Sequence, residues 1–494
     1  MTGEAATWTE QRAAELVAAI GEGTTESMAY ATAFAARLRH PDGTVCFPQT
    51  VDWLRQRQWP DGSWGGAVPQ PSDRLVSTLA AVVALADRPD PWARYAVQAG
   101  IGYVQRQPAA WRGAPHEMIA FELAVPHLLG EARERGLDLP YPEFDDLARA
   151  RADKLARVPP DAWSSRPTPL LYSLEVLTGE FDAAPAGRFL SVNGSLGHSP
   201  PATAAYWAAT GEPAALAYLD GLAAKSRDGG FPEVQPIATF ETAWVLYLLQ
   251  RVNLRPTTAW RHLATLRRQL VDTGLAAIDP GFPVPDSDDS AMVFNTLLGA
   301  GYDVGHRLGS LLAFEGDAWF STFPYERGAS VSANARVLEA FSHRPAGFPV
   351  QLAKLVRYLL GERRDGAWWQ DKWHASAHYA TAQVVFALGR VLPPGQLAGT
   401  WRWLVDGQRG DGSWGACGGT AEETAYAVLA LDALSAYRPA PSTTFAAAAA
   451  YLREQVEADA YPELWIGKGL YTPHNVVRAA VLAGYAVAAG RGAE

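Results

Sequence analysis

Three aspartates within four residues carry the clearest chemical potential in this sequence. Asp286, Asp288 and Asp289 stand in the run Asp-Ser-Asp-Asp, directly before the apolar stretch 291–294. One interpretation is structural: Asp289 or Asp288 caps the helix by accepting hydrogen bonds from free backbone N–H groups, and the other carboxylates are solvated. The other is chemical, because desolvation and mutual repulsion favour the protonated form of carboxyl groups that face apolar walls. Such an acid, kept away from water, could protonate a carbon–carbon double bond and start carbocation chemistry.

Helices joined by glycine–aromatic turns are the elements that must position these aspartates. The segment 53–64 carries Trp, Leu, Gln, Gly, Ser and Trp at a spacing that recurs in the segment 403–414. Weaker copies of the turn occur at 193–196, 228–231 and 365–368. An Asp-Gly or Asn-Gly pair ends a helix through a left-handed residue that glycine adopts at little cost. The repeat therefore predicts a chain of helical hairpins.

Inner and outer helices can be told apart by their composition. The stretches that follow the turns, such as 77–85 and 423–429, open with polar residues and are then almost wholly apolar, which is typical of buried inner helices. Charged stretches such as 11–20 are expected to form outer walls. With no alternating strand pattern between them, the hairpins predict an all-α fold of α/α barrels. The aspartates occupy a repeat position and would lie at the mouth of a barrel, although the same turns could also serve a solenoid without catalytic activity.

The composition is that of a large globular protein. Of the 494 residues, 48% are hydrophobic and 19% are charged, which excludes disorder as the main state and leaves room for two or three domains. The net charge of −10 would repel a nucleic acid partner. Cys46 and Cys417 form neither a disulfide framework nor a metal-binding pattern, which indicates a reducing cytoplasm. Without a signal-peptide pattern or an apolar stretch near ~20 residues, we expect a cytoplasmic protein with no transmembrane segment.

Together these features resemble the class II terpene cyclases, the group that contains bacterial labdane-type diterpene cyclases, plant copalyl diphosphate synthases and squalene-hopene cyclases. The resemblance covers nearly the whole chain. It rests on the two QW-type repeats, the DxDD motif at 286–289 and smaller blocks at 121–129, 173–175, 193–204, 229–241 and 464–471.

The resemblance implies a particular domain organisation. Proteins of this family consist of two α/α barrels, the β and γ domains, with γ inserted after the first helix of β. Carried over, this assigns residues 1–19 and 256–494 to the β domain, which holds the DxDD motif, and residues 20–255 to the γ domain. The active site is then expected between the two domains.

Roles for the polar residues follow from the same resemblance. Asp288 matches the general acid of the family, and Asp286 and Asp289 match the residues that hold its proton in a reactive orientation. Asn334 falls where plant-type enzymes place an asparagine that hydrogen-bonds the acid, although a polar residue near a helix start is also ordinary.

Other residues are assigned to the two ends of the substrate. Glu122 matches a glutamate associated with Mg²⁺ at the diphosphate end, and Lys468 matches a lysine that reaches the same end. A solvated surface residue is the alternative for both. The aromatic side chains of Trp373 and Tyr379 are candidates for lining the cavity, since ring faces attract cations, and core packing is the competing explanation.

Two positions depart from the plant pattern. Tyr172 and Glu233 stand where plant ent-copalyl synthases carry a His and an Asn that govern the final deprotonation. We expect both to contact the substrate, but the identity and stereochemistry of the product cannot be carried over. The chain also lacks the DDxxD motif of diphosphate-ionising enzymes, so we expect the product to retain its diphosphate.

The leading hypothesis is therefore protonation-initiated cyclisation of geranylgeranyl diphosphate to a bicyclic labdane-type diphosphate. The same chemistry on farnesyl diphosphate, giving drimenyl diphosphate, is the alternative. Squalene cyclisation is disfavoured by the chain length and the number of QW repeats. A non-catalytic α/α-barrel binding protein would use the aspartates only as a helix cap, and a zinc prenyltransferase would need zinc ligands that are not evident around Cys417. The sequence makes no prediction of the oligomeric state.

Overall fold

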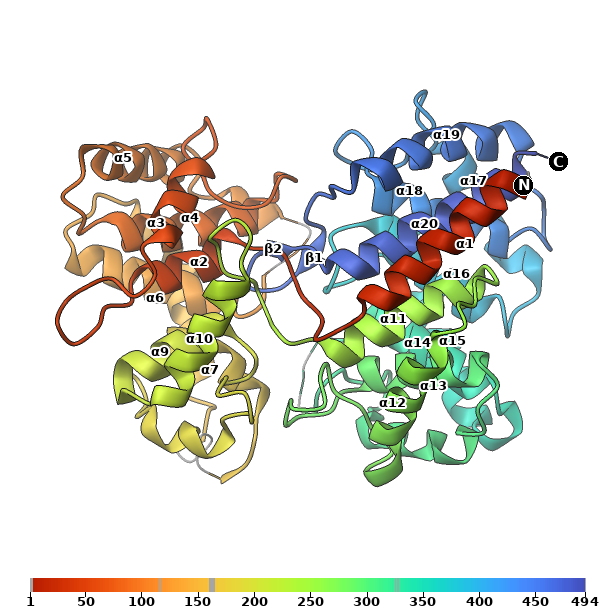
Figure 1. Ribbon diagram of the computed structural model, residues 1–494, viewed down its shortest axis with the longest axis horizontal. Helices are drawn as coiled ribbons and strands as arrows, with labels where there is room; N and C mark the ends of the chain where they lie inside the picture. The colour runs from red at the N-terminus through yellow and green to blue at the C-terminus, as the bar shows by residue number, and fades with distance from the viewer. Residues whose placement is uncertain are drawn as a thin grey trace.

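The protein consists of two helical lobes joined by a short β-hairpin. A computed structural model describes residues 3–114, 116, 118–159, 165–324, 326 and 328–493. Within these ranges the β-strands are β1 (Trp465–Ile466) and β2 (Leu470–Tyr471), which pair antiparallel and lie between the lobes (Figure 1). The prediction of an all-α fold is confirmed.

The first lobe is a ring of inner helices surrounded by outer helices. Helix α2 packs on α4, α4 on α6, α6 on the 3₁₀ helix η3, η3 on α9, and α9 again on α2. Helices α3, α5, α7 and α10 lie outside this ring. The bounds are α2 Ala29–Ala36, α3 Gln49–Gln56, α4 Pro71–Leu85, α5 Pro91–Arg106, α6 Phe121–Glu134, α7 Asp145–Leu155, η3 Pro169–Val176, α9 Pro200–Thr210 and α10 Pro213–Lys225.

The second lobe closes a ring of six inner helices. Each of α11, α13, α14, α16, α18 and α20 packs on the next, and α20 packs back on α11. Helices α12, α15, α17, α19 and the N-terminal α1 form the outer layer. The bounds are α1 Gly3–Ala19, α11 Ala238–Arg251, α12 Ala259–Asp272, α13 Ser287–Gly299, α14 Val331–Ser342, α15 Pro349–Gly361, α16 Ala377–Leu388, α17 Ala398–Asp406, α18 Ala421–Ala433, α19 Ser442–Ala458 and α20 His474–Arg491.

Each lobe has its own hydrophobic core, and the chain crosses between the cores four times. The first core includes residues from Met28 to Phe231 together with Ile466 and Leu470 of the hairpin, and the second includes part of α1 and the other core residues from Val234 onward. The first lobe therefore interrupts the second after α1. Helix α11 belongs to the second core, so the predicted boundary at residue 255 assigned this helix to the wrong lobe. That boundary followed the turn after α11, whereas α11 is needed to close the inner ring between α13 and α20.

In each of the two strong glycine–aromatic repeats, the tryptophan of the turn makes the same hydrogen bond to the helix that precedes it. Trp64 Nε1 donates to the carbonyl of Leu54 at 2.8 Å, and Trp414 Nε1 donates to that of Leu404 at 2.7 Å. The glycine two residues before each tryptophan has a φ near +90°, which favours glycine over any L-residue. The tryptophan thus packs back on the helix that has just ended, which explains why its spacing is conserved between the two repeats.

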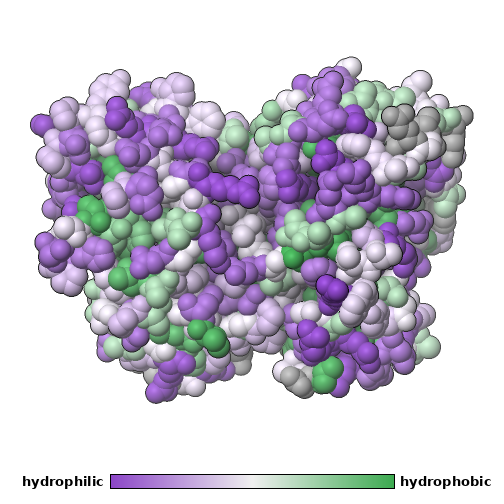
Figure 2. Space-filling model, viewed as in Figure 1, coloured by the Kyte–Doolittle hydropathy of each residue, from purple (hydrophilic) through white to green (hydrophobic). Residues whose placement is uncertain are grey.

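The outer surface of the molecule is mixed in character. On the face shown in Figure 2, polar residues cover both lobes and hydrophobic residues gather in small, separate groups. Among the described residues, no helix combines the length and hydrophobicity that would let it cross a membrane.

Candidate active site

The aspartate run begins the inner helix α13. Asp286 is the N-cap residue, and its Oδ1 accepts a hydrogen bond from the backbone N–H of Asp289 at 2.7 Å. The helix cap expected at Asp289 or Asp288 is therefore formed by Asp286, the first aspartate of the run. It leaves the side chain of Asp288 available for other contacts, since the helix cap does not use it.

Asp286 and Asp289 form a buried pair of carboxyl groups. Their exposed fractions are 3% and 5%. Burial, together with the neighbouring carboxylates, raises the pKa of Asp286 well above its ordinary value. Burial also raises the pKa of Asp289, to about 7. Near neutral pH the pair therefore retains at least part of a proton, which reduces the repulsion that two adjacent carboxylates would exert on each other.

Asp288 is held by a buried arginine. Arg336 Nη1 donates to Asp288 Oδ1 at 2.5 Å. Burial raises the pKa of the Asp288 carboxyl, and the guanidinium of Arg336 opposes that rise. The side chain of Asp288 keeps 16% of its surface accessible, more than either of the other two aspartates. Asp288 is thus the member of the run that a substrate can reach.

Arg336 was not singled out from the sequence. It lies on α14 with 1% of its surface exposed, donates a second hydrogen bond to the hydroxyl of Tyr379, and covers the ring of Trp244 at 4.8 Å from the ring centroid. Arg336 and Glu339 are the charged residues of the inner helix 331–341, and Arg336 was the available signal, because a fully buried arginine requires a partner.

The predicted contact between Asn334 and the acid is wrong. The side-chain amide of Asn334 donates to the carbonyls of Phe320 and Ser330, and its oxygen accepts from the N–H of Phe320 at 2.8 Å. Residues two apart on a helix point to nearly opposite sides. Arg336 therefore faces Asp288, while Asn334 faces away and anchors the loop that precedes α14.

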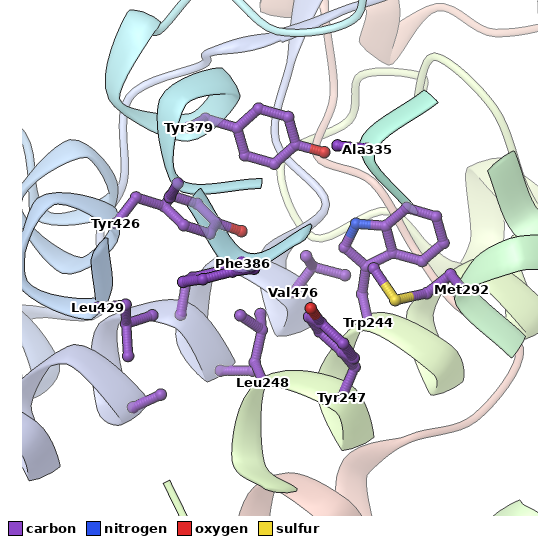
Figure 3. Close-up of a cluster of buried hydrophobic side chains, with 14 of the residues drawn as sticks. Trp244, Tyr247, Leu248, Met292, Ala335, Tyr379, Phe386, Tyr426, Leu429 and Val476 are labelled. Atoms are coloured by element: carbon purple, nitrogen blue, oxygen red, sulfur yellow. The ribbon is translucent and has the colours of Figure 1, made fainter. Parts of the chain in front are cut away.

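Aromatic side chains surround the acid site, and Tyr379 is one of them. Its ring stacks on His374 at 4.1 Å and meets Tyr426 and Trp465 edge-on at 5.0 and 5.1 Å. Figure 3 shows Tyr379, Tyr426 and Trp244 around the same part of the interior. These rings offer the π-faces that a carbocation requires.

Trp373 occupies a different place. Its carbonyl accepts the N–H of Ile466 in β1, and its ring lies under the ammonium of Lys372 at 4.8 Å. The side chain is partly exposed. The structure therefore places Trp373 beside the β-hairpin, outside the ring contacts that join Tyr379 to its neighbours.

The hairpin brings three other predicted residues together. Its turn carries Lys468, whose backbone N–H donates to Glu233 Oε1 at 2.8 Å, and the hydroxyl of Tyr172 donates to the same oxygen. The ammonium of Lys468 pairs with Glu175 at 2.8 Å, donates to Ser199 at 2.6 Å and lies 4.2 Å from the centroid of the Tyr172 ring. Lys468 is 1% exposed, so the expectation of a solvated lysine is excluded. Glu175 lies in a block noted in the sequence, but its pairing with a lysine so distant along the chain could not be anticipated.

Glu122 lies in the first turn of α6 and pairs with Lys154. The start of α6 approaches the hairpin, since the N–H of Ile119 donates to the carbonyl of Gly467 at 2.7 Å. In the described parts of the chain, no group of three or more His, Cys, Asp or Glu side chains is arranged to hold a metal ion.

Comparisons with known proteins agree with this geometry. No family model matches the sequence. The chain is 31% identical to a type B diterpene cyclase of Mycobacterium tuberculosis over 94% of its length and 96% of the relative. It is 33% identical to a copalyl diphosphate synthase of Streptomyces cyslabdanicus, with 87% and 86% covered. The ent-copalyl diphosphate synthase structure from Streptomyces platensis superposes with a TM-score of 0.84 at 31% identity, covering 97% of this chain and 99% of that one.

Two helical barrels with an aspartate run at the mouth of one of them define a class of enzyme, and the chain belongs to it: it is a class II terpene cyclase. Within that class its relatives include bacterial diterpene cyclases and copalyl diphosphate synthases. The non-catalytic binding protein and the zinc prenyltransferase are thereby set aside.

Proposed function

We propose that the enzyme cyclises geranylgeranyl diphosphate to a bicyclic labdane-type diphosphate, with Asp288 as the general acid. The observation that carries this proposal is the accessibility of Asp288 at the mouth of the barrel, beside two buried carboxyl groups and a ring of aromatic side chains. The choice of a C20 substrate is supported by relatives that are named diterpene cyclases and copalyl diphosphate synthases.

The pairing of Asp288 with Arg336 suits proton transfer to an alkene. The described hydrogen bond to Arg336 uses Oδ1, which leaves Oδ2 to carry the proton. An alkene is a very weak base, so the acid must be strong. When Oδ2 transfers its proton to the terminal alkene carbon, Asp288 becomes a carboxylate that the guanidinium already faces, and this stabilises the charge that develops in the transition state.

After protonation, the positive charge moves along the folded chain as two rings close. Tyr379, Tyr426 and Trp244 would stabilise this charge through their ring faces, each by ~0.5–2 kcal/mol. The reaction ends when a proton is lost from carbon, and the diphosphate is retained because no ionisation step is involved. The absence of a DDxxD motif in the sequence supports retention.

We assign the hairpin cluster to the far side of the substrate. Lys468, Tyr172 and Glu233 meet where a segment of the second lobe enters the first. Lys468 would have to exchange its contact with Glu175 for one with the diphosphate. Trp373, beside the same hairpin, would line the passage toward it.

Magnesium would enter this site with the substrate. Mg²⁺ is usually bound by one or two carboxylates together with substrate phosphates, and Glu122 is a carboxylate near the start of α6, where that helix approaches the hairpin. The chemistry that Mg²⁺ would supply is neutralisation of the diphosphate charge.

The substitution Asp288→Asn tests the general acid. The amide of asparagine retains an oxygen that can accept the hydrogen bond from Arg336. It is not an acid, however, and cannot protonate an alkene. We expect product formation from geranylgeranyl diphosphate, measured after dephosphorylation by gas chromatography and mass spectrometry, to fall by at least ~100-fold. Helix content should be unchanged. Cyclisation at the wild-type rate would refute the assignment, and a parallel incubation with farnesyl diphosphate decides between the C20 and C15 substrates.

A further inference from the structure

Another buried carboxylate, Glu422, lies on the same rim as the acid. Glu422 is in the first turn of the inner helix α18 and is 1% exposed. Its Oε1 accepts a hydrogen bond from Trp465 Nε1 at 3.0 Å and lies 3.3 Å from His374 Nε2. Its Oε2 is buried and has no hydrogen-bond partner. A buried carboxylate oxygen without a partner is uncommon and costly, and it calls for an explanation.

Two uncharged donors fix the orientation of this carboxylate. His374 Nδ1 accepts the backbone N–H of Ser376 at 3.0 Å. This contact assigns the ring proton to Nε2, which donates it to Glu422. The imidazole and the indole of Trp465 therefore both act as N–H donors to Oε1, and neither brings a positive charge to the carboxylate. Oε2 is left free in a defined direction.

Aromatic contacts connect Glu422 to the acid site. The ring of His374 stacks on Tyr379, and the hydroxyl of Tyr379 accepts a hydrogen bond from Arg336, the partner of Asp288. One turn after Glu422, the buried hydroxyl of Tyr426 also has no hydrogen-bond partner. Glu422 and Asp288 thus lie at the starts of two inner helices, joined through Tyr379, around the aromatic cluster in which the cation is proposed to form.

We infer that Glu422 is the base that ends the cyclisation. Oε2 takes a proton from a carbon next to the cationic centre, the electrons of that C–H bond form the product alkene, and the positive charge on the substrate is cancelled. The glutamic acid then loses its proton to solvent, and Asp288 takes up a proton from solvent before the next turnover. This inference rests on the proposed function, because it needs a carbocation to deprotonate.

Glu233, at the hairpin, is one competing acceptor, since its Oε2 is also buried and without a partner. Burial raises the pKa of its carboxyl, but the backbone N–H of Lys468 donates to this carboxylate and the charge of Lys468 opposes that rise. A nearby cation makes a carboxylate a weaker proton acceptor. Glu422 has only neutral donors among its described hydrogen bonds.

The substitution Glu422→Gln separates the two roles of the side chain. Glutamine keeps an oxygen that can accept from Trp465 and His374, but it replaces the free Oε2 by an amide. We expect the variant to consume geranylgeranyl diphosphate while the share of the wild-type alkene falls at least tenfold, in favour of isomeric alkenes or an alcohol formed by water capture. The matched control is Glu423→Gln, the adjacent buried carboxylate that Thr420 and His378 contact. Its product mixture should match that of the wild type.

The outcomes distinguish this inference from the proposed function. An unchanged alkene in Glu422→Gln overturns the inference, and a changed product in Glu233→Gln instead identifies Glu233 as the base. If Glu422→Gln does not fold or does not consume substrate, the variant Trp465→Phe provides the test. It keeps the carboxylate of Glu422 but removes one of the two donors that orient it, so the product mixture should shift in the same direction. An unchanged product mixture overturns the inference. Normal turnover by Asp288→Asn would instead refute the proposed function.

Discussion

The buried pair Asp286 and Asp289 should make the stability of the enzyme depend on pH in a direction opposite to that of ordinary carboxylates. Burial raises the pKa of Asp289 to about 7 from the ordinary 3.8. The folded protein therefore holds this proton more tightly than the unfolded chain does, so the stabilisation is complete below the unfolded pKa and is lost as the pH rises through about 7. At 1.36 kcal/mol per pH unit, the full loss is about 4 kcal/mol.

The substitution Asp289→Asn removes this titration and provides the test. The free energy of unfolding is measured by urea denaturation from pH 5.5 to 8.5, a window that contains about 2 kcal/mol of the expected loss. We expect the wild type to lose that amount relative to the variant. Asp73, whose pKa burial raises to about 6, titrates in both proteins and cancels in the difference. Parallel curves for the two proteins, or a wild type that gains stability relative to the variant, would refute the reasoning.

Two further predictions concern the acid and the metal. Arg336→Met removes the cation that lowers the pKa of Asp288. The alkaline decline of the pH–rate profile should therefore move to higher pH, and the maximal rate should fall by about 10²–10³-fold. An unshifted profile would contradict the role of this ion pair. Removal of Mg²⁺ by a chelator should lower the rate of cyclisation at least ~10-fold, because phosphate-bound Mg²⁺ offsets the charge of the diphosphate. The rate should recover when Mg²⁺ is added back. Undiminished activity in the chelator would count against a role for magnesium.

Local sequence patterns predicted the parts of this fold that depend on local contacts. The spacing of the glycine–aromatic turns follows from a tryptophan that reaches back ten residues to a carbonyl of the preceding helix, as in Trp64 and Leu54. The aspartate run was also expected to cap its own helix, and it does so, although through Asp286 and not through Asp288 or Asp289. Such features repeat because the same short segment always makes the same contacts.

The failed expectations depend on contacts that a single segment does not determine. The partner of Asp288 was expected at Asn334 but is Arg336, since the phase of α14 relative to α13 decides which side chain faces the acid. The boundary before α11 depends on the closing of a ring of six helices. Lys468 was recognised, but its ion pair with Glu175 forms only when the hairpin enters the other lobe.

That hairpin has a consequence for how these enzymes can be recombined. Ile466 and Leu470 belong to the core of the first lobe, and the N–H of Leu470 donates to Asp73 Oδ1 at 3.0 Å, although both residues are encoded after most of the second lobe. A chimaera that exchanges residues 28–231 for those of a relative would pack the hairpin of the original protein into the core of a lobe from another protein. Segment 465–471 must therefore be transplanted from the same parent as the lobe that receives it.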